Sequence, residues 1–312
     1  MLSIQNISFS YLKQKTIPSF SLELEEGRTL AIIGESGCGK STLLKLIYGL
    51  HDLDEGHIFW KEEEVLGPKY HLIPGMDYMK YLAQDFDLMP FITVAENVGK
   101  YLSNIDKKKK QNRILELLEI VEMTEFANVK AKYLSGGQMQ RVALARVLAL
   151  EPEVLLLDEP FSHIDNFRKN SLRRSLFKYL KANQITTIIA SHDENDYLPF
   201  VDEIVVLKDG KQVAKGTPKK LIANPPNYYV ASLFDDVNEI KASYFDTNSD
   251  EFILVYPNQL KVVKDSKFKV KVTQNYFKGS HYLIEATYDD GNLFFMNDDS
   301  IEIGKEVCLN LK

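Results

Sequence analysis

One glycine-rich loop constrains what this chain can fold into more than any other feature. It reads Gly34-Glu35-Ser36-Gly37-Cys38-Gly39-Lys40-Ser41, after a short apolar run at 29–33 and before a segment, 41–50, that we expect to be helical. Its glycines let the backbone wrap a phosphate with the N–H groups turned inward. Lys40 supplies positive charge for the β- and γ-phosphates, Ser41 supplies a Mg²⁺ ligand, and the helix adds its positive N-terminal end. The pattern therefore predicts a strand, a phosphate loop (34–41) and a helix, in that order.

A second apolar run ends in two carboxylates, in the sequence Val154-Leu155-Leu156-Leu157-Asp158-Glu159-Pro160. The run is short enough to be a strand that is buried on both faces. Asp158 is placed to hold Mg²⁺, usually through water, and Glu159 to polarise the water that attacks the γ-phosphate. Two carboxylates could also be a plain polar strand end. Because a phosphate loop is present, we interpret them as the other half of a nucleotide site.

A third segment, called here the Ser-Gly-Gly loop, reads Leu134-Ser135-Gly136-Gly137-Gln138-Met139-Gln140-Arg141. Ser-Gly-Gly before a helix is again an anion site, because the first N–H groups of a helix lack partners. One fold has no obvious need of two phosphate loops for one nucleotide. We therefore expect this loop to serve a nucleotide that is held mainly by another subunit.

The order of the remaining segments indicates an α/β domain followed by a small all-β domain. Residues 93–150 are expected to be largely helical, with Asp106 capping one helix and the lysines 107–110 as its solvated start; a nucleic-acid or lipid role for these lysines is the alternative. Helices that alternate with apolar strands imply a parallel sheet covered on both faces. Residues 204–213 predict a hairpin. After about residue 240 only short alternating strands remain, which suits a small barrel.

Length and composition set the outer bounds. The 312 residues suggest about two domains, and the net charge of −6, from 38 basic and 44 acidic residues, disfavours a general nucleic-acid binder. No apolar run approaches the ~18 residues of a membrane span. The first residues lack the regions of a secretory signal, and the two cysteines form no disulfide framework. We expect a soluble protein of a reducing compartment with more than one domain.

Together the phosphate loop, the Ser-Gly-Gly loop and the run 155–160, in that order and spacing, resemble the ATP-binding subunit of an ABC transporter. The resemblance covers residues 1–238 and implies a P-loop NTPase fold with a helical subdomain at about 86–150. It also implies that ATP and Mg²⁺ are the cofactors. The departures are minor: Met139 stands where many members have Gln, and His163 and Ile164 replace a small residue and Leu.

The resemblance also assigns smaller sites. Gln84 is similar to the Q-loop glutamine, which approaches Mg²⁺ and senses the membrane subunits, and Asp165 to the D-loop aspartate. His192 is similar to the switch histidine on the γ-phosphate, although alone it would be a core histidine. Tyr11 stands where the family places an aromatic that stacks on adenine, although alone it would be a strand-end aromatic. The implied catalytic residues are Glu159, His192 and Lys40; the implied metal ligands are Ser41, Gln84 and Asp158; and the implied nucleotide contacts are Tyr11, Gly34, Glu35, Ser36, Gly37, Cys38, Gly39, Lys40, Ser41, Thr42, Gln84, Ser135, Gly136, Gly137, Gln138 and Asp165.

The last part of the chain narrows the resemblance to importers. The segment 276–285 resembles the strand–turn–strand of the TOBE (transport-associated OB) domain, and 256–260 resembles its Arg-Pro-Glu segment without the charges. We therefore expect a TOBE-like domain at 239–312, either regulating or stabilising a dimer. This points to importers of ferric ion, polyamine, sulfate, molybdate or sugars.

The sequence predicts an ATPase subunit that energises solute import from the cytoplasmic face of the bacterial inner membrane. Two copies are expected to close head to tail, and the partners are membrane permease subunits and, through them, a solute-binding protein, with no nucleic acid. Two alternatives stay open. One is a soluble ABC ATPase of translation or DNA repair, although such proteins usually carry two modules or a long coiled coil. The other is a ligand-sensing regulatory ATPase.

Overall fold

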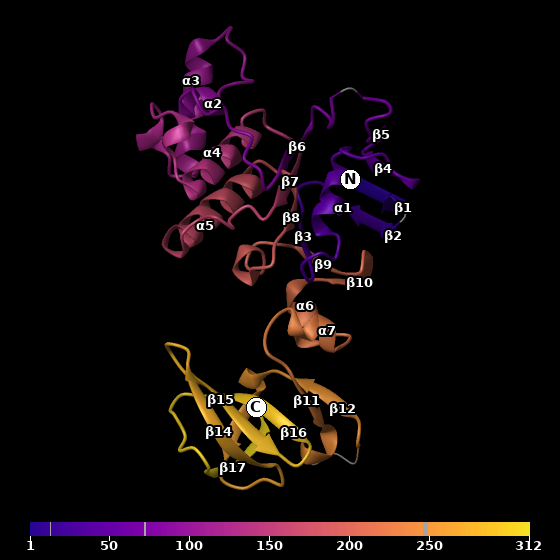
Figure 1. The fold of residues 1–312 in the computed structure, drawn as a ribbon, viewed down its shortest axis with the longest axis vertical. Helices are drawn as coiled ribbons and strands as arrows, with labels where there is room; N and C mark the ends of the chain where they lie inside the picture. Colours follow the sequence, from indigo (N-terminus) through magenta and orange to yellow (C-terminus); the bar gives the residue numbers. More distant parts are fainter. Residues whose placement is uncertain (13, 72, 246–248) are drawn as a thin grey trace. The chain divides into compact units, whose positions relative to one another are not determined.

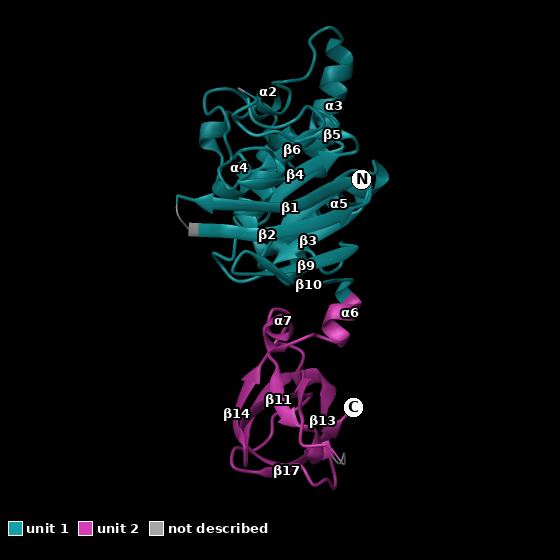
Figure 2. Cartoon of the chain, turned by 90° about the vertical axis from the view of Figure 1, so that its right-hand side faces the viewer, with its two compact units in different colours: residues 1–218 teal, residues 219–312 magenta. Residues whose placement is uncertain are grey.

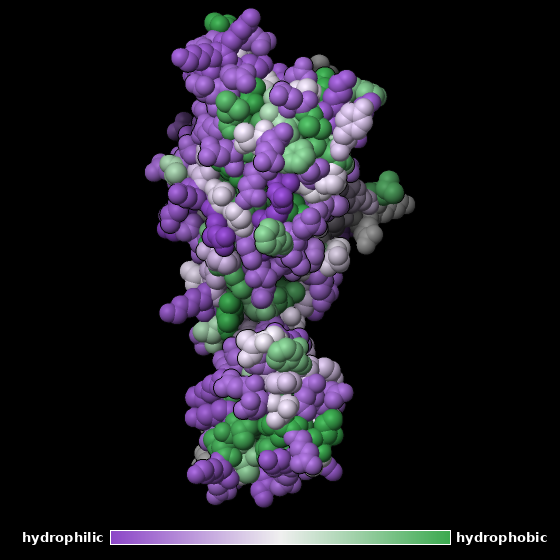
Figure 3. Space-filling view, turned by 90° about the vertical axis from the view of Figure 1, so that its left-hand side faces the viewer, coloured by the Kyte–Doolittle hydropathy of each residue, from purple (hydrophilic) through white to green (hydrophobic). Residues whose placement is uncertain are grey.

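The computed structural model describes residues 1–12, 14–71, 73–245 and 249–312, and these form two compact units, Met1–Pro218 and Lys219–Lys312 (Figures 1 and 2). Each unit has its own apolar core. Among the described residues, none of the helices combines the length and the apolar character needed to cross a membrane. Polar side chains cover most of the face drawn in Figure 3, with scattered hydrophobic patches between them.

The first unit contains two sheets. An antiparallel sheet has the order β2-β1-β4-β5, made of β1 (Leu2–Tyr11), β2 (Gln14–Leu24), β4 (Glu55–Trp60) and β5 (Glu63–Glu64). A larger sheet has the order β10-β9-β3-β8-β7-β6, made of β3 (Thr29–Ile33), β6 (Met79–Leu82), β7 (Val154–Asp158), β8 (Thr186–Ala190), β9 (Glu203–Lys208) and β10 (Lys211–Gly216). Its strands are parallel except for the β9–β10 hairpin.

The central strands are buried on both faces, as their apolar runs predict. Every residue of β3, β7 and β8 is buried. One face packs with α1 (Lys40–Ile47) and the antiparallel sheet in a single core. The remaining helices of this unit are α2 (Val94–Val98), α3 (Lys107–Ile120), α4 (Gly136–Leu148) and α5 (Asn166–Ala182), with short 3₁₀ turns at Thr124–Phe126, Ala131–Tyr133 and Glu194–Asp196.

Local predictions from the sequence are confirmed at several points. The Asp106 carboxylate accepts a hydrogen bond of 2.9 Å from the Lys109 N–H and so caps α3. The hairpin between β9 and β10 turns through Asp209 and Gly210, both with left-handed φ, of 50° and 72°. A Cβ at Gly210 would lie 1.9 Å from the Thr16 carbonyl oxygen, so only glycine fits this turn.

The second unit is a curled antiparallel sheet, as the alternating pattern predicts. Its main sheet has the order β13-β17-β14-β15-β16, and β13 also contacts β16, so the sheet approaches closure. Phe268 and Phe295 lie in its core. Its elements are α6 (Pro218–Ala223, starting at the last residue of the first unit), α7 (Tyr228–Ser232), β11 (Asn238–Lys241), β12 (Phe252–Val255), β13 (Leu260–Val263), β14 (Lys269–Phe277), β15 (Tyr282–Tyr288), β16 (Gly291–Asn297) and β17 (Glu306–Leu311), with 3₁₀ turns at Ala242–Phe245 and Pro257–Gln259.

The division between the compact units falls twenty residues before the boundary predicted at 238. Residues 219–238 group with the β unit. The buried Tyr256 hydroxyl donates a hydrogen bond of 3.3 Å to the Ala231 carbonyl of α7, which ties this helix to the strands that follow. The sequence-based boundary was placed where helical segments give way to strands. The contact between Tyr256 and α7 crosses that point, so the helical residues before it group with the β unit.

Candidate nucleotide site

The phosphate loop connects β3 to α1 and depends on left-handed glycines. Gly34, Gly37 and Gly39 have φ of 147°, 82° and 107°. A Cβ at Gly34 would lie 2.2 Å from the Leu207 carbonyl oxygen, so the loop can pass β9 this closely only with glycine here. Gly39 is the N-cap of α1 and has no side chain to occupy the first N–H groups. These groups are available to an anion, as predicted for a phosphate loop.

The Lys40 ammonium lies inside the curve of the loop. It donates hydrogen bonds of 2.7 Å to the Gly34 carbonyl and 2.9 Å to the Glu35 carbonyl. The Cys38 thiol is buried beside it, and this burial raises the pKa of the thiol although the nearby ammonium opposes the shift. The thiol therefore stays neutral, and Lys40 is the basic group of the loop.

Ser41 and Asp158 meet at the start of α1. The Ser41 hydroxyl donates to Asp158 Oδ1 at 3.0 Å, and the Tyr81 hydroxyl donates to Asp158 Oδ2 at 3.1 Å. Burial, together with the charge of Asp158, raises the pKa of Tyr81 far above its ordinary value, so the phenol remains a donor. Sequence reasoning missed Tyr81. The only indication was its place in β6, three residues before Gln84.

A cavity of about 230 Å³ brings together side chains from three motifs. The parallel pairing of Leu82 with Leu157 places the chain after β6 beside the chain after β7, and so sets Gln84 near Glu159. Thr16 of β2, which the sequence did not single out, also lines the cavity. The full lining is Thr16, Ser36, Gly37, Gly39, Lys40, Ser41, Thr42, Gln84 and Glu159.

Glu159 is held by an extended polar network. Its backbone φ is 50°, and its N–H donates to the Ala190 carbonyl at 2.9 Å. His192 Nδ1 lies 2.9 Å from Glu159 Oε2, and the buried Ser191 hydroxyl lies 3.4 Å from the same oxygen. Ser191 also donates to Asp196 at 2.6 Å. The structure thus brings His192 to the predicted catalytic carboxylate.

The Ser-Gly-Gly loop forms a separate site. Ser135 caps α4 through a reciprocal pair of bonds with Gln138: the Gln138 N–H donates to Ser135 Oγ at 3.3 Å, and the Ser135 N–H donates to Gln138 Oε1 at 2.8 Å. A cavity of about 410 Å³ lies here, lined by Phe126, Ser135, Gly136, Gly137, Gln138, Arg141, His163, Ile164, Asp165 and Arg168. Asp165 therefore joins the Ser-Gly-Gly loop and not the phosphate loop. Among the residues described, no side chain lines both cavities.

Tyr11 belongs to neither cavity. It ends β1, and its ring packs edge-on against Phe9 with centroids 4.8 Å apart. Its hydroxyl lies 3.3 Å from His51 Nε2. Its adenine-stacking role stays a prediction.

These features together define a P-loop nucleotide-binding fold. They are a strand followed by a loop of left-handed glycines around Lys40, and the Ser41 hydroxyl bonded to the buried Asp158 carboxylate. Comparison of the chain with known proteins narrows this class to one family. The sequence model of the ABC transporter family matches residues 17–162.

Curated relatives match along most of the chain. It is 30% identical to a spermidine/putrescine import ATP-binding protein, PotA, of Clostridioides difficile, over 100% of this chain and 95% of that protein. It is 30% identical to the Fe(3+) ions import ATP-binding protein FbpC 2 of Haemophilus influenzae, over 89% of this chain and 85% of that protein. It is 34% identical to the sulfate/thiosulfate import ATP-binding protein CysA 1 of Shewanella oneidensis, over 86% of this chain and 73% of that protein.

Solved structures agree on the fold. The dimeric post-hydrolysis state of the ATP-binding cassette MJ0796, bound to ADP and Pi, superposes with a TM-score of 0.62 at 29% identity, covering 70% of this chain and 99% of that one. The structure of CbiO1 of Clostridium perfringens superposes with a TM-score of 0.63 at 26% identity, covering 72% of this chain and 90% of that one. The chain belongs to the ABC transporter family, as an ATP-hydrolysing subunit that energises solute import.

Proposed function

We propose that two copies of this chain bind and hydrolyse Mg-ATP head to tail to drive import of a polyamine, ferric ion or sulfate through a separate permease. The observation that carries the nucleotide part is the Ser41–Asp158 hydrogen bond beside the cavity that Lys40, Gln84 and Glu159 line. The solute classes come from the names of the relatives, which are import subunits for these three solutes.

The residues at the start of α1 fit a magnesium ion. Mg²⁺ prefers oxygen ligands and keeps several waters. The Ser41 hydroxyl and the Asp158 carboxylate supply two such oxygens, and both Asp158 oxygens are oriented by hydrogen bonds from Ser41 and Tyr81. Ser41 and Asp158, with Gln84 from the cavity wall, would hold the ion. When bound, it would neutralise charge on the β- and γ-phosphates.

The chain's own groups then act mainly by position and charge. The Lys40 ammonium exchanges the loop carbonyls for phosphate oxygens and stabilises the charge that develops on them. The Glu159 carboxylate accepts a hydrogen bond from the attacking water and orients it toward the γ-phosphate. His192 bonds the same carboxylate, so it can fix its orientation and reach the phosphate from the same side.

The two separate cavities support a head-to-tail dimer. The phosphate loop lines one cavity and the Ser-Gly-Gly loop lines the other, so one copy alone leaves the second anion site without a nucleotide. In the proposed dimer, Ser135 to Gln138 and Asp165 of one copy cover the ATP on the phosphate loop of the other. The solved structure of the related MJ0796 cassette is dimeric, which supports the dimer part of the proposal.

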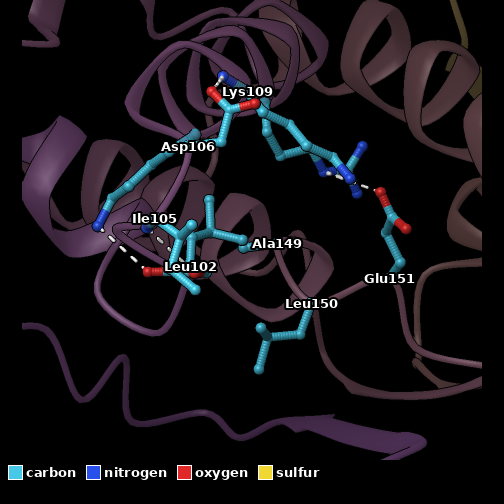
Figure 4. Close-up of a pocket in the computed structure, with 10 residues that line it drawn as sticks. Leu102, Ile105, Asp106, Lys109, Ala149, Leu150 and Glu151 are labelled. Atoms are coloured by element: carbon cyan, nitrogen blue, oxygen red, sulfur yellow. Dashed lines mark hydrogen bonds and ion pairs between the residues drawn. The ribbon is translucent and has the colours of Figure 1, made fainter.

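A further cavity, on the helical part of the first unit, is the place where we propose that the permease docks (Figure 4). It measures about 390 Å³ and combines the apolar side chains Leu102, Ile105 and Leu150 with charged groups such as Lys109 and Glu151. Ile105 is 97% exposed, so an apolar helix of the permease would cover it favourably. The chain would then lie on the cytoplasmic face of the membrane, and a solute-binding protein would deliver solute to the permease.

We further propose that 239–312 is a TOBE-like domain that regulates or stabilises the dimer. Its curled antiparallel sheet suits an OB-like barrel. It carries none of the nucleotide motifs, which all lie before residue 193.

The test of the proposed function is Glu159→Gln. The amide keeps the shape but loses the carboxylate that orients water. The variant should bind ATP like the wild type and release almost no phosphate, and Mg-ATP should hold two copies together during size-exclusion chromatography. Hydrolysis at the wild-type rate would show that Glu159 is not the catalytic carboxylate.

A further inference from the structure

Gln140 lies at the centre of three hydrogen bonds that none of the roles above uses. It belongs to α4 and is 2% exposed. Its Nε2 donates to the Glu159 carbonyl at 2.9 Å and to the Ser162 hydroxyl at 3.3 Å, and its Oε1 accepts from the His163 N–H at 3.0 Å. Both ends of the amide are therefore used, and the partners lie on the loop that follows β7 (159–165).

The backbone of Glu159 depends on this amide. A residue with a side chain at φ 50° persists only where its surroundings hold it. The Glu159 N–H is held by the Ala190 carbonyl, and its own carbonyl accepts the 2.9 Å bond from Gln140. Because the peptide groups on both sides are held, the direction of the carboxylate is set by α4 as well as by the sheet.

The same contact reaches the Ser-Gly-Gly loop. Gly137, in the first turn of α4, packs so closely on the loop after β7 that a Cβ there would lie 2.6 Å from the His163 carbonyl oxygen. Gln140 lies one turn further along the same helix and binds the N–H of His163. The helix that carries Ser135 and the loop that carries Glu159 and Asp165 are thus joined by one side chain.

We propose that Gln140 is a positioning residue for hydrolysis. Its hydrogen bonds fix the backbone of Glu159 and hold the loop 159–165 against α4, the helix that follows the Ser-Gly-Gly loop. The position of the Glu159 carboxylate and the position of the surface that contacts the partner's nucleotide are therefore coupled. The inference rests on the proposed function, because it takes Glu159 as the residue that orients water. Gln140 does not line the cavity of the phosphate loop, so it should affect the rate and not ATP binding.

The experiment compares two isosteric changes of buried amides. Gln140→Glu keeps size and the acceptor for His163 but replaces the donor to the Glu159 carbonyl with a carboxylate oxygen that repels it. The matched control is Asn97→Asp, because Asn97 is fully buried in α2 and also donates two hydrogen bonds, to the Met89 and Thr93 carbonyls, and accepts one, from the Met89 N–H. If the charged variant does not fold, Gln140→Met replaces it in the experiment, because methionine has a similar volume and no hydrogen-bond donor.

Hydrolysis rate and ATP affinity of the full-length chain are measured separately, by phosphate release and calorimetry. Gln140→Glu or Gln140→Met should lower kcat about tenfold or more while ATP affinity stays within about twofold. Asn97→Asp should lower thermal stability to a similar degree and keep kcat within about twofold. A kcat for the Gln140 variants equal to that of Asn97→Asp, or a parallel loss of affinity and rate, would overturn the proposal.

Glu159→Gln is assayed alongside. If it hydrolyses ATP at the wild-type rate, the proposed function itself fails. If it is inactive while the Gln140 variants are fully active, only the positioning role fails.

Discussion

The buried ion pair between Arg173 and Asp196 allows a quantitative test of how the region behind Glu159 is held. The side chains are 5% and 3% exposed. Arg173 Nε donates to Asp196 Oδ1 at 2.8 Å, Nη2 bonds the same oxygen, and Nη2 also donates to Asp193 at 2.8 Å. The other Asp196 oxygen accepts the bond from Ser191, which contacts Glu159. Burial already raises the pKa of Asp196, although its hydrogen bonds oppose the shift.

Arg173→Met removes the cation and leaves the buried Asp196 carboxylate without it. Breaking a buried pair from one side costs about 3–5 kcal/mol, so the free energy of unfolding should fall by about that amount at neutral pH. Part of the loss should return as pH falls, because a carboxyl whose folded pKa is raised binds a proton more readily in the native than in the unfolded state. Adding Asp196→Asn should also restore much of the loss, since it removes the unpaired charge and keeps an acceptor for Ser191.

Urea unfolding followed by tryptophan fluorescence provides the measurement. The sequence has one tryptophan, Trp60, and it is buried in β4, so its emission reports the first unit. The midpoint and slope are compared at about pH 7.5 and about pH 5.5 for the wild type and the single and double variants. A loss below about 1 kcal/mol for Arg173→Met, or a double variant no more stable than the single one, would refute the reasoning.

Three further outcomes are expected. Lys40→Ala should cost about 1.5–3 kcal/mol of ATP binding, because it removes a charge-assisted contact to phosphate; unchanged affinity in calorimetry would refute this role. Tyr11→Ala should weaken ATP and GTP alike by ~1–3 kcal/mol, because stacking reads the face of a base and not its edge; native affinity would place Tyr11 outside the site. Hydrogen bonds from Lys61 and Trp60 lower the pKa of Glu153 below its ordinary 4.5, so its contribution to stability is present above that pH and lost as pH falls through the folded value. Glu153→Gln should therefore flatten the acid limb of stability measured by fluorescence, and an unchanged slope would contradict the contact.

Local patterns predicted those parts of the molecule that depend on neighbours in sequence. The phosphate loop, the strand that ends at Asp158 and the capping of α3 by Asp106 each follow from residue types at fixed short spacings. The short alternating strands of the second unit were predicted for the same reason.

The features that were missed depend on partners far apart in sequence. Tyr81 meets Asp158 only because β6 pairs with β7, and Gln140 meets Glu159 only because α4 packs beside the loop after β7. Arg173 on α5 reads as one more basic residue of a polar helix until the fold brings Asp196 to it. No local spacing encodes these contacts, so the support around the site could be found only in three dimensions.

The central claim is that one ATP lies between the phosphate loop of one copy and the Ser-Gly-Gly loop of the other. The most direct measurement is sedimentation velocity of Glu159→Gln with Mg-ATP, with and without a second change, Ser135→Asp. Aspartate keeps the helix cap that Ser135 provides and adds a negative charge that repels the partner's γ-phosphate. The account predicts that the single variant dimerises and that the double variant binds ATP equally well but stays monomeric. Equal dimerisation of both variants would contradict it.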